Sequence, residues 1–284
     1  MINNKIAIIT DSSCDLTNEY IVANNIFVLP LHINMPDGKH YLDGVDITPE
    51  EIYNNMPSVI PTTSQPSPDD VMKLFDRIKQ EGYKEAVAVM ISSGMSGTYQ
   101  VMKMCVTEEK ELKVHAYDSK KLSMALGMVV INAVELMEQG ISGEEIVSQL
   151  AQNRDKSNGY FCIPTLSYLV KGGRIGKVAG TIGTLLGLVP VISINQDGQY
   201  YSAIKTLNYA IAMRKMVDRI KGIIKDKIVD IAILQGNAKD KAKELFDIFK
   251  DITGIRNLMM CPLSPTMGIH SGPGLVGLVY RIID

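Results

Sequence analysis

The residues best suited to chemistry in this chain lie at positions 92–98, in the segment Ser-Ser-Gly-Met-Ser-Gly-Thr. They directly follow an apolar run at residues 86–91 and precede a segment with helical spacing. This order predicts a strand, a tight loop and a helix that Ser96 opens. Backbone N–H groups at the start of a helix, together with serine hydroxyls, suit an anion or the oxyanion of a reaction.

A second group of hydroxyls lies at residues 62–67, Thr-Thr-Ser-Gln-Pro-Ser. Ser67 precedes Pro68 and two aspartates, a pattern that predicts the N-cap of a helix. Thr63 and Ser64 lie outside that helix and have no evident structural task, so either could contact a ligand.

Of the four histidines, His270 is distinctive because glycines and a proline surround it in Met-Gly-Ile-His-Ser-Gly-Pro-Gly. This composition predicts a rigid loop that a ligand can approach closely, although an incidental loop histidine fits the same pattern.

Arg174, after two glycines, is interpreted as either a surface residue of a turn or a binding contact. Asp15 is expected to cap a helix, and Asp11 to orient another loop by accepting its N–H groups.

The first half of the chain alternates strands with helices, which predicts a parallel sheet covered by helices on both faces. The polar loops that follow its strands, including the segment around Thr63, should share the edge where such sheets bind ligands. Strands are expected at residues 5–10, 26–31, 86–91 and 114–118, and a hairpin near 36–39. Helices are expected at 16–24, from 49, at 68–81, from the Ser/Gly loop to 109, and at 123–138 and 143–156.

The second half predicts a mixed α+β domain, which makes the protein a two-domain α/β chain with domains at residues 1–158 and 159–284. A hairpin is expected around Gln196-Asp197-Gly198. The other expected strands are at 160–163, 230–234, 258–261 and 276–282, and the helices at 166–171, 177–186, 209–225 and 239–250.

Composition excludes several classes of function. The net charge of −2 leaves no basic excess for nucleic acid or an anionic membrane. The longest apolar stretch, residues 181–194, is too short to span a bilayer and contains Pro190, so we expect buried core and no stable membrane insertion.

Four widely spaced cysteines predict a reduced, cytoplasmic protein. The 16 methionines fit either chance or an adaptable apolar pocket.

Two functions from different classes fit these residues. A serine hydrolase would use Ser96 as nucleophile and His270 as base, but the G-x-S-x-G pattern fails because its last position is Thr98. A binding protein for an amphiphile would hold a small anionic head on hydroxyls and N–H groups, and an apolar tail among methionines.

The chain resembles the DegV family of bacterial fatty-acid-binding proteins over essentially its full length. Five motifs carry this resemblance in the family's order and spacing. They are Thr-Asp-Ser at 10–12 with Asp-Leu at 15–16, Thr-Ser-Gln-Pro-Ser at 63–67, Ser-Ser-Gly-Met-Ser-Gly-Thr-Tyr at 92–99, Lys-Gly-Gly-Arg-Ile at 171–175, and His-Ser-Gly-Pro-Gly at 270–274.

The resemblance implies a two-domain α/β fold with a long-chain fatty acid, such as palmitate, at the domain junction. It implies that Thr63 and Ser96 hold the carboxylate together with His270, and that Ser64, Ser93 and Gly94 adjoin it. It also implies a carrier without cofactor or metal, not an enzyme, that presents the acid to a separate kinase for acyl-phosphate formation. We therefore expect no nucleotide site in this chain, and its sequence has no P-loop motif.

Overall fold

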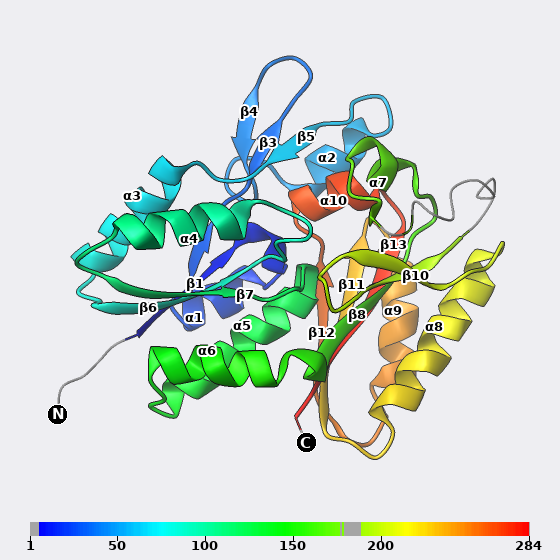
Figure 1. The fold of residues 1–284 in the computed structure, drawn as a ribbon. Helices are drawn as coiled ribbons and strands as arrows, with labels where there is room; N and C mark the ends of the chain where they lie inside the picture. Colours follow the sequence, from blue (N-terminus) through cyan, green and yellow to red (C-terminus); the bar gives the residue numbers. More distant parts are fainter. Residues whose placement is uncertain (1–5, 177, 179–188, 284) are drawn as a thin grey trace.

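The computed structural model describes residues 6–176, 178 and 189–283 and shows two sheets side by side, with helices around and between them (Figure 1). All of the helix expected at residues 177–186 except residue 178, and much of the apolar stretch at 181–194, lie outside the described residues. Within the described residues, no helix is both long and apolar enough to cross a lipid bilayer.

The first sheet contains four parallel strands, as the alternating pattern predicted. Successive residues of its strands face opposite sides, so Ile6 and Ile8 join one apolar cluster while Ala7 and Ile9 join another. In spatial order the strands are β2 (Phe27–Leu29), β1 (Ile6–Asp11), β6 (Glu85–Met90) and β7 (Lys113–Asp118).

Helices cover both faces of this sheet. On one face, apolar residues of α3 (Pro68–Gln80) and α4 (Thr98–Glu108) pack against the strands, and on the other face α5 (Ser123–Glu138) and α6 (Gly143–Gln152) do so. Ser67 caps α3 as expected, since its side chain accepts a hydrogen bond from Asp70 N. The helix expected at 143–156 ends at Gln152 and is followed by the 3₁₀ turn η2 (Arg154–Lys156).

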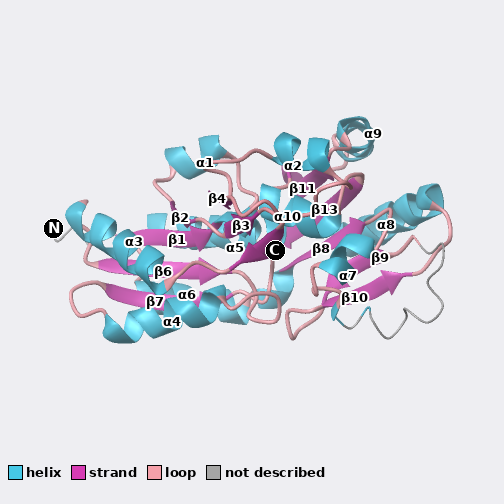
Figure 2. Ribbon diagram, turned by 90° about the horizontal axis from the view of Figure 1, so that it is seen from above, coloured by secondary structure: helices cyan, strands magenta, loops and turns pink. Residues whose placement is uncertain are grey.

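The second sheet has six strands, antiparallel throughout except for the parallel pair β11–β12. Two helices, α8 (Tyr209–Ile224) and α9 (Lys239–Phe249), pack against one of its faces (Figure 2). The predicted hairpin is β9–β10. In spatial order the strands are β10 (Tyr200–Ile204), β9 (Val191–Ile194), β8 (Ser157–Cys162), β13 (Leu275–Ile282), β11 (Val229–Gly236) and β12 (Ile255–Pro262).

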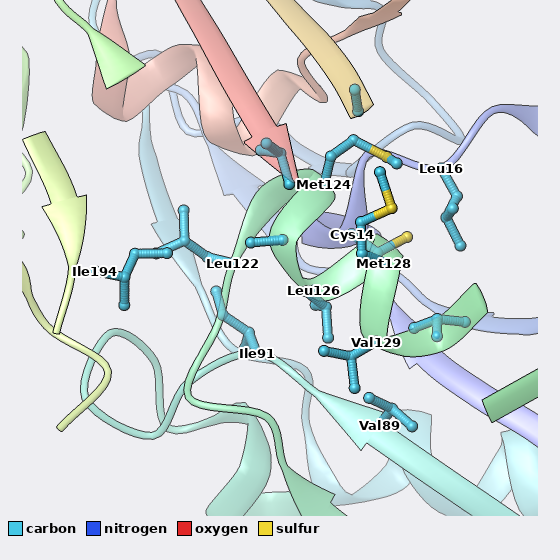
Figure 3. Close-up of a cluster of buried hydrophobic side chains, with 14 of the residues drawn as sticks. Cys14, Leu16, Val89, Ile91, Leu122, Met124, Leu126, Met128, Val129 and Ile194 are labelled. Atoms are coloured by element: carbon cyan, nitrogen blue, oxygen red, sulfur yellow. The ribbon is translucent and has the colours of Figure 1, made fainter. Parts of the chain in front are cut away.

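Helix α5 lies between the two sheets and contacts strands of both, β1 and β6 of the first and β8 and β13 of the second. Figure 3 shows Met124, Leu126 and Met128 of this helix among Val89 from the first sheet and Ile194 from the second. One hydrophobic core therefore joins the two halves. The proposed domain boundary after residue 158 falls two residues into β8, which begins at Ser157.

A third, small antiparallel sheet lies at one end of the molecule (Figure 1). The hairpin predicted near residues 36–39 connects two of its strands. Thr63 lies in the third strand, so the expectation that its segment follows a strand of the parallel sheet was wrong. The elements here are β4 (His40–Leu42), β3 (His32–Asn34), β5 (Thr62–Ser64) and α2 (Pro49–Asn55).

Asp15 is not the N-cap of a helix, contrary to expectation. Thr17 caps α1 (Asn18–Ala23), while Asp15 follows the 3₁₀ turn η1 (Ser12–Cys14) in the left-handed region, with φ of 54°. The Asp15 side chain is buried and accepts hydrogen bonds from Ser264 N and Ser123 Oγ instead. Ser264 is distant in sequence, so no local pattern could indicate this partner.

Candidate functional site

A small cavity lies at the junction of the two halves, with about 40 Å³ of free space. This volume accommodates a few water molecules or a small polar head group, but not a long alkyl chain. Residues from both halves line it: Leu31, Thr63, Ser64, Gln65, Ile91, Met95, Ser96, Leu122, Arg174, Tyr200, Thr266, Met267 and His270.

His270 lies on the helix α10 (Pro265–Ser271), which corrects the expectation of a loop. Ser264 is the N-cap and Pro265 the first helical residue, while Gly272 ends the helix with φ of 70°. The helix packs against β5 and against α7 (Ser167–Lys171), so the small third sheet and the second half meet here. Gly272 therefore ends the helix, Gly268 lies inside it, and the imidazole belongs to a well-packed element.

Two buried carboxyl groups fix the start of α10. Asp15 Oδ1 accepts a hydrogen bond from Ser264 N at 2.8 Å, and Asp43 Oδ1 accepts one from Thr266 N at 3.0 Å. Burial raises the pKa of Asp15 to about 7 and that of Asp43 to about 6. The position of α10 thus depends on contacts with the N-terminal half.

The imidazole of His270 pairs with the hydroxyl of Thr63, with 2.8 Å between Nε2 and Oγ1. Burial, with a smaller contribution from the charge of Arg174, lowers the pKa of His270 to about 4, so the ring is neutral at pH 7. Its Nδ1 is buried without a hydrogen-bond partner among the described residues. A buried N–H without an acceptor is rarer than an unsatisfied acceptor, which favours the tautomer with the proton on Nε2.

This tautomer decides what Thr63 can do. When His270 Nε2 donates to Thr63 Oγ1, the hydroxyl proton of Thr63 stays available for another acceptor. Gly172, at the end of α7, permits the close packing of the ring, since a Cβ there would lie 2.2 Å from His270 Nδ1. The pair therefore presents one hydroxyl donor in a fixed position at the cavity.

The Ser/Gly loop after β6 is held mainly by its own hydroxyls. Ser92 Oγ donates to Gly198 O at 2.8 Å, and Ser93 Oγ accepts from Lys120 Nζ at 2.7 Å. Ser96 Oγ lies 2.8 Å from Thr98 Oγ1. The N-cap of α4 is Gly97 and not Ser96.

Asp11 orients this loop, as its place after the first strand predicted. Its carboxylate accepts hydrogen bonds from Ile91 N at 2.7 Å and from Ser13 N at 3.1 Å. Burial, only partly offset by these hydrogen bonds, raises the pKa of Asp11 to about 6. The loop and α10 are thus both anchored by buried aspartates.

The structure brings four of the six candidate residues to the cavity, namely Thr63, Ser64, Ser96 and His270. Ser93 and Gly94 are not among the residues that line it. Gly94 instead packs against the β9–β10 turn, where a Cβ would lie 2.9 Å from the carbonyl oxygen of Asp197.

The sequence did not indicate that Thr266 lines the cavity. It left two interpretations of Arg174 open, a surface residue of a turn and a binding contact. Arg174 lines the cavity and donates from Nη1 to Gly172 O at 2.7 Å. Thr266 could have been found, because Ser264-Pro265 repeats the cap-and-proline pattern of Ser67-Pro68. A helix starting there places Thr266 one turn before His270.

The described residues contain no cluster of three or more histidine, cysteine or acidic side chains arranged to hold a metal ion. All four cysteines, Cys14, Cys105, Cys162 and Cys261, are buried and free.

The whole chain is similar to known proteins. A family model described as uncharacterised proteins of the DegV family matches residues 5–282. A DegV domain-containing protein of Clostridium acetobutylicum is 40% identical over 277 residues, which cover 97% of this chain and 98% of that protein. A second one from the same organism is 38% identical over 275 residues, with the same coverage.

Two solved structures with related sequences share the fold. One is described as showing fatty acid binding by a DegV family protein of Thermus thermophilus, with a TM-score of 0.89 and 28% identity over 98% of this chain and 100% of that one. The other is a fatty acid binding DegV family protein of Streptococcus agalactiae, with a TM-score of 0.88 and 28% identity over 99% of both chains.

Proposed function

The chain belongs to the DegV family, and we propose that it binds a long-chain fatty acid whose carboxylate occupies the cavity between its two halves. The observation that carries the proposal is the pair of Thr63 and neutral His270, because a proton on His270 Nε2 leaves the Thr63 hydroxyl free to donate to a ligand. A carboxylate only accepts hydrogen bonds and so matches this donor. Fatty acid binding by the relatives from Thermus thermophilus and Streptococcus agalactiae supports the choice of ligand.

In this proposal the head-group residues have different tasks. Thr63 donates to the carboxylate, and His270 positions the Thr63 hydroxyl by donating to its oxygen. Ser96, which shares a hydrogen bond with Thr98 in the free protein, can turn its hydroxyl to the ligand. Ser64 lines the cavity beside them, whereas a ligand role for Ser93 and Gly94 would require the loop to rearrange.

The tail requires more space than the 40 Å³ of the cavity. The wall of the cavity contains Met95, Met267 and Leu122. Methionine side chains change rotamer easily. We propose that these side chains move apart as the tail enters. Burying a sixteen-carbon tail contributes on the order of 10 kcal/mol before ordering costs, at ~0.8 kcal/mol per methylene. The tail thus supplies most of the affinity and the head-group site the selectivity.

A displacement assay tests the proposal. The purified protein is loaded with a fluorescent long-chain fatty acid and titrated with palmitate or with methyl palmitate. Palmitate should displace the probe, and methyl palmitate should do so at least about 10-fold less well, because the ester lacks a charged acceptor. Equal displacement by acid and ester, or no binding of the probe, would refute it. Native mass spectrometry after gentle purification should also detect a co-purified fatty acid.

The alternative function, a serine hydrolase, requires Ser96 to be activated by His270. In the described residues Ser96 Oγ pairs with Thr98, His270 Nε2 pairs with Thr63, and no carboxylate accepts from His270 Nδ1. A histidine with a pKa of about 4 is also a weak general base. This geometry favours binding over hydrolysis. A covalent adduct on Ser96 after treatment with a fluorophosphonate would reverse the preference.

We further propose that the bound acid is presented to a separate kinase, which forms the acyl-phosphate in the cytoplasm, where ATP and reduced cysteines are found. The support is the resemblance of the five motifs, together with the lack of a P-loop motif in this sequence. Incubation with palmitate, ATP and candidate kinases of the host should yield acyl-phosphate. If palmitate binds but no host kinase gives turnover, the carrier function is wrong and the binding function stands.

A further inference from the structure

A polar cleft of about 630 Å³ lies between residues 120–121, the 3₁₀ turn η2 and the β9–β10 hairpin. None of the residues that line it also lines the head-group cavity. Its volume is in the range of sites that hold small metabolites. The proposed function makes no use of this cleft.

Lys121 brings a buried positive charge to the cleft. Only 4% of this residue is exposed, and in the described part of the chain its ammonium group has no hydrogen bond and no carboxylate within 4 Å. Burial lowers the pKa of Lys121 to about 8, while the charge of Asp155 raises it and that of Arg154 lowers it, so the group is mostly charged at pH 7. Because a buried charge without a bonded partner is costly, this ammonium group is suited to an anion that enters the cleft.

Arg154 supplies a second cation from η2. Its Nε donates to Tyr117 Oη at 3.2 Å, and its guanidinium group lies over the Tyr117 ring, 5.6 Å from the ring centre. These contacts orient the guanidinium group, while Nη1 and Nη2 make no hydrogen bond to any residue that the structure describes. Two such nitrogens can bind two oxygens of a phosphate side by side.

Lys120, the neighbour of Lys121, also lines the cleft, but its charge is already compensated. Its Nζ lies 2.7 Å from Asp118 Oδ2 and donates to Ser93 Oγ at 2.7 Å. The positive charge that is available to a ligand is therefore that of Lys121 and Arg154.

The rest of the cleft carries groups that bind hydroxyls. Asn195, Gln196 and Tyr201 of the β9–β10 hairpin line it, together with the carboxyl groups of Asp155 and Asp197. Amide and carboxylate oxygens accept hydrogen bonds from hydroxyl groups, whereas carboxylates repel a ligand that is anionic throughout. This wall therefore favours a molecule that combines one anionic group with hydroxyl groups.

We propose that this cleft binds a phosphate group, which Lys121 and Arg154 hold. Its size and its hydroxyl-binding wall favour a phosphate ester of a small hydroxylated molecule over free phosphate. The site is independent of the proposed function. It adjoins the fatty acid site, since Lys121 O accepts a hydrogen bond from Ser92 N at 2.8 Å and Leu122 lines the head-group cavity.

Thermal unfolding of the full chain tests the proposal, with inorganic phosphate, glucose 6-phosphate or glucose added at constant ionic strength. A ligand that binds only the folded protein raises the unfolding temperature. Phosphate also stabilises proteins through its exclusion from their surface, so the apparent affinity is taken from the difference between variants. Stronger binding of glucose 6-phosphate than of phosphate would assign the site to an ester, and the reverse to free phosphate. Binding of neither would overturn the inference.

K121M replaces the ammonium group by an apolar end of similar length and should fold, because it removes a costly buried charge. We expect it to bind phosphate at least about 10-fold more weakly than the wild type. K171M is the matched control, since Lys171 is exposed and lines a different cleft beside His270, and its affinity should stay within about 2-fold. Equal responses of the wild type and K121M would overturn the inference.

Two further variants keep the proposal testable if K121M folds poorly. R154M should lose about 10-fold in phosphate affinity. D155N removes a negative charge that acts on Lys121, so it should bind phosphate about 2- to 5-fold more tightly. Full affinity of R154M, or weaker binding by D155N, would contradict the assignment of the phosphate to Lys121 and Arg154.

Discussion

Two walls of the cavity differ in what their polar atoms do in the free protein. The loop wall, residues 92–98, uses its hydroxyls on protein partners, since Ser92 contacts Gly198 and Ser96 contacts Thr98. The helix wall, α10, carries a buried polar atom without a hydrogen-bond partner among the described residues, His270 Nδ1. The loop is prominent in the sequence, but the helix holds more unused hydrogen-bonding capacity.

This difference shows that a run of hydroxyls and glycines can serve the fold as much as a ligand. Ser92 and Gly94 join the loop to the β9–β10 turn of the other half. The helix wall has few polar residues, and buried carboxyl groups from the other half hold it in place. Substitutions that alter one wall at a time test this difference between the loop wall and the helix wall. They are given in order, from the largest expected effect to the smallest.

The anchoring of the helix wall should make folding stability depend on pH. Because the pKa of Asp15 is raised to about 7 in the folded state, the folded protein holds a proton there that the unfolded chain releases near pH 4. The unfolding free energy should therefore fall as the pH rises from 5 to 7, by up to about 1.4 kcal/mol per pH unit from this group. Denaturant unfolding at several pH values measures it. D15N, which does not titrate, should show a shallower slope, and identical slopes would contradict the prediction.

Removing the hydroxyl next to His270 should have the largest effect on binding. T63V leaves His270 Nε2 without its partner and the carboxylate without a donor, so palmitate affinity should fall roughly 10- to 100-fold. Calorimetric or displacement titration measures it. T62V is the control, because Thr62 adjoins Thr63 on β5 but does not line the cavity. Affinity of T63V within 2-fold of the wild type would remove Thr63 from the site.

A methyl group at Gly172 should disturb the helix wall alone. Gly172 has φ of −77°, so alanine is allowed there by the backbone, but its Cβ would lie 2.2 Å from His270 Nδ1. Displacing the ring should weaken palmitate binding by about 10-fold, in line with the cost of overpacking a filled site. G222A is the matched control, since a Cβ at that glycine of α8 would have no neighbour within 4 Å beyond the adjacent backbone of its own helix. Equal affinities of the two variants would show that His270 does not orient the ligand donor.

Truncation of the loop wall should have the smallest effect. S96A removes a hydroxyl that Thr98 already engages, so the loss of affinity should be about 3-fold or less. S93A should leave affinity unchanged within error, because Ser93 contacts Lys120 and does not line the cavity. Titration with palmitate compares both with T63V. A larger effect of S96A than of T63V would reverse the ranking of the two walls.

Local signals in the sequence predicted most of the fold. Helix starts followed from cap-and-proline pairs such as Ser67-Pro68, and the strands of the parallel sheet from apolar runs bounded by turn residues. The same signal at Ser264-Pro265 did not lead to a predicted helix, because the glycines around His270 suggested a loop. Without α10, the position of Thr266 at the cavity could not be predicted.

Other features depend on contacts that no local pattern encodes. Thr63 is a strand residue because β5 pairs with β3, about 30 positions away, and Asp15 is buried because it meets Ser264 at the far end of the chain. Thr63, Ser64, Ser96 and His270 come together as the motifs indicated. The hydrogen bond between Thr63 and His270, and the partners that occupy the loop hydroxyls, required the structure.

Helix α5, which packs against both sheets, has a consequence for how the molecule can be divided. A fragment ending at residue 158 would retain α5 but expose to water the apolar surface that β8 and β13 cover in the full chain. Such a surface favours aggregation over autonomous folding. The two halves are separate in topology but share this core, so we expect that neither half folds when it is expressed alone.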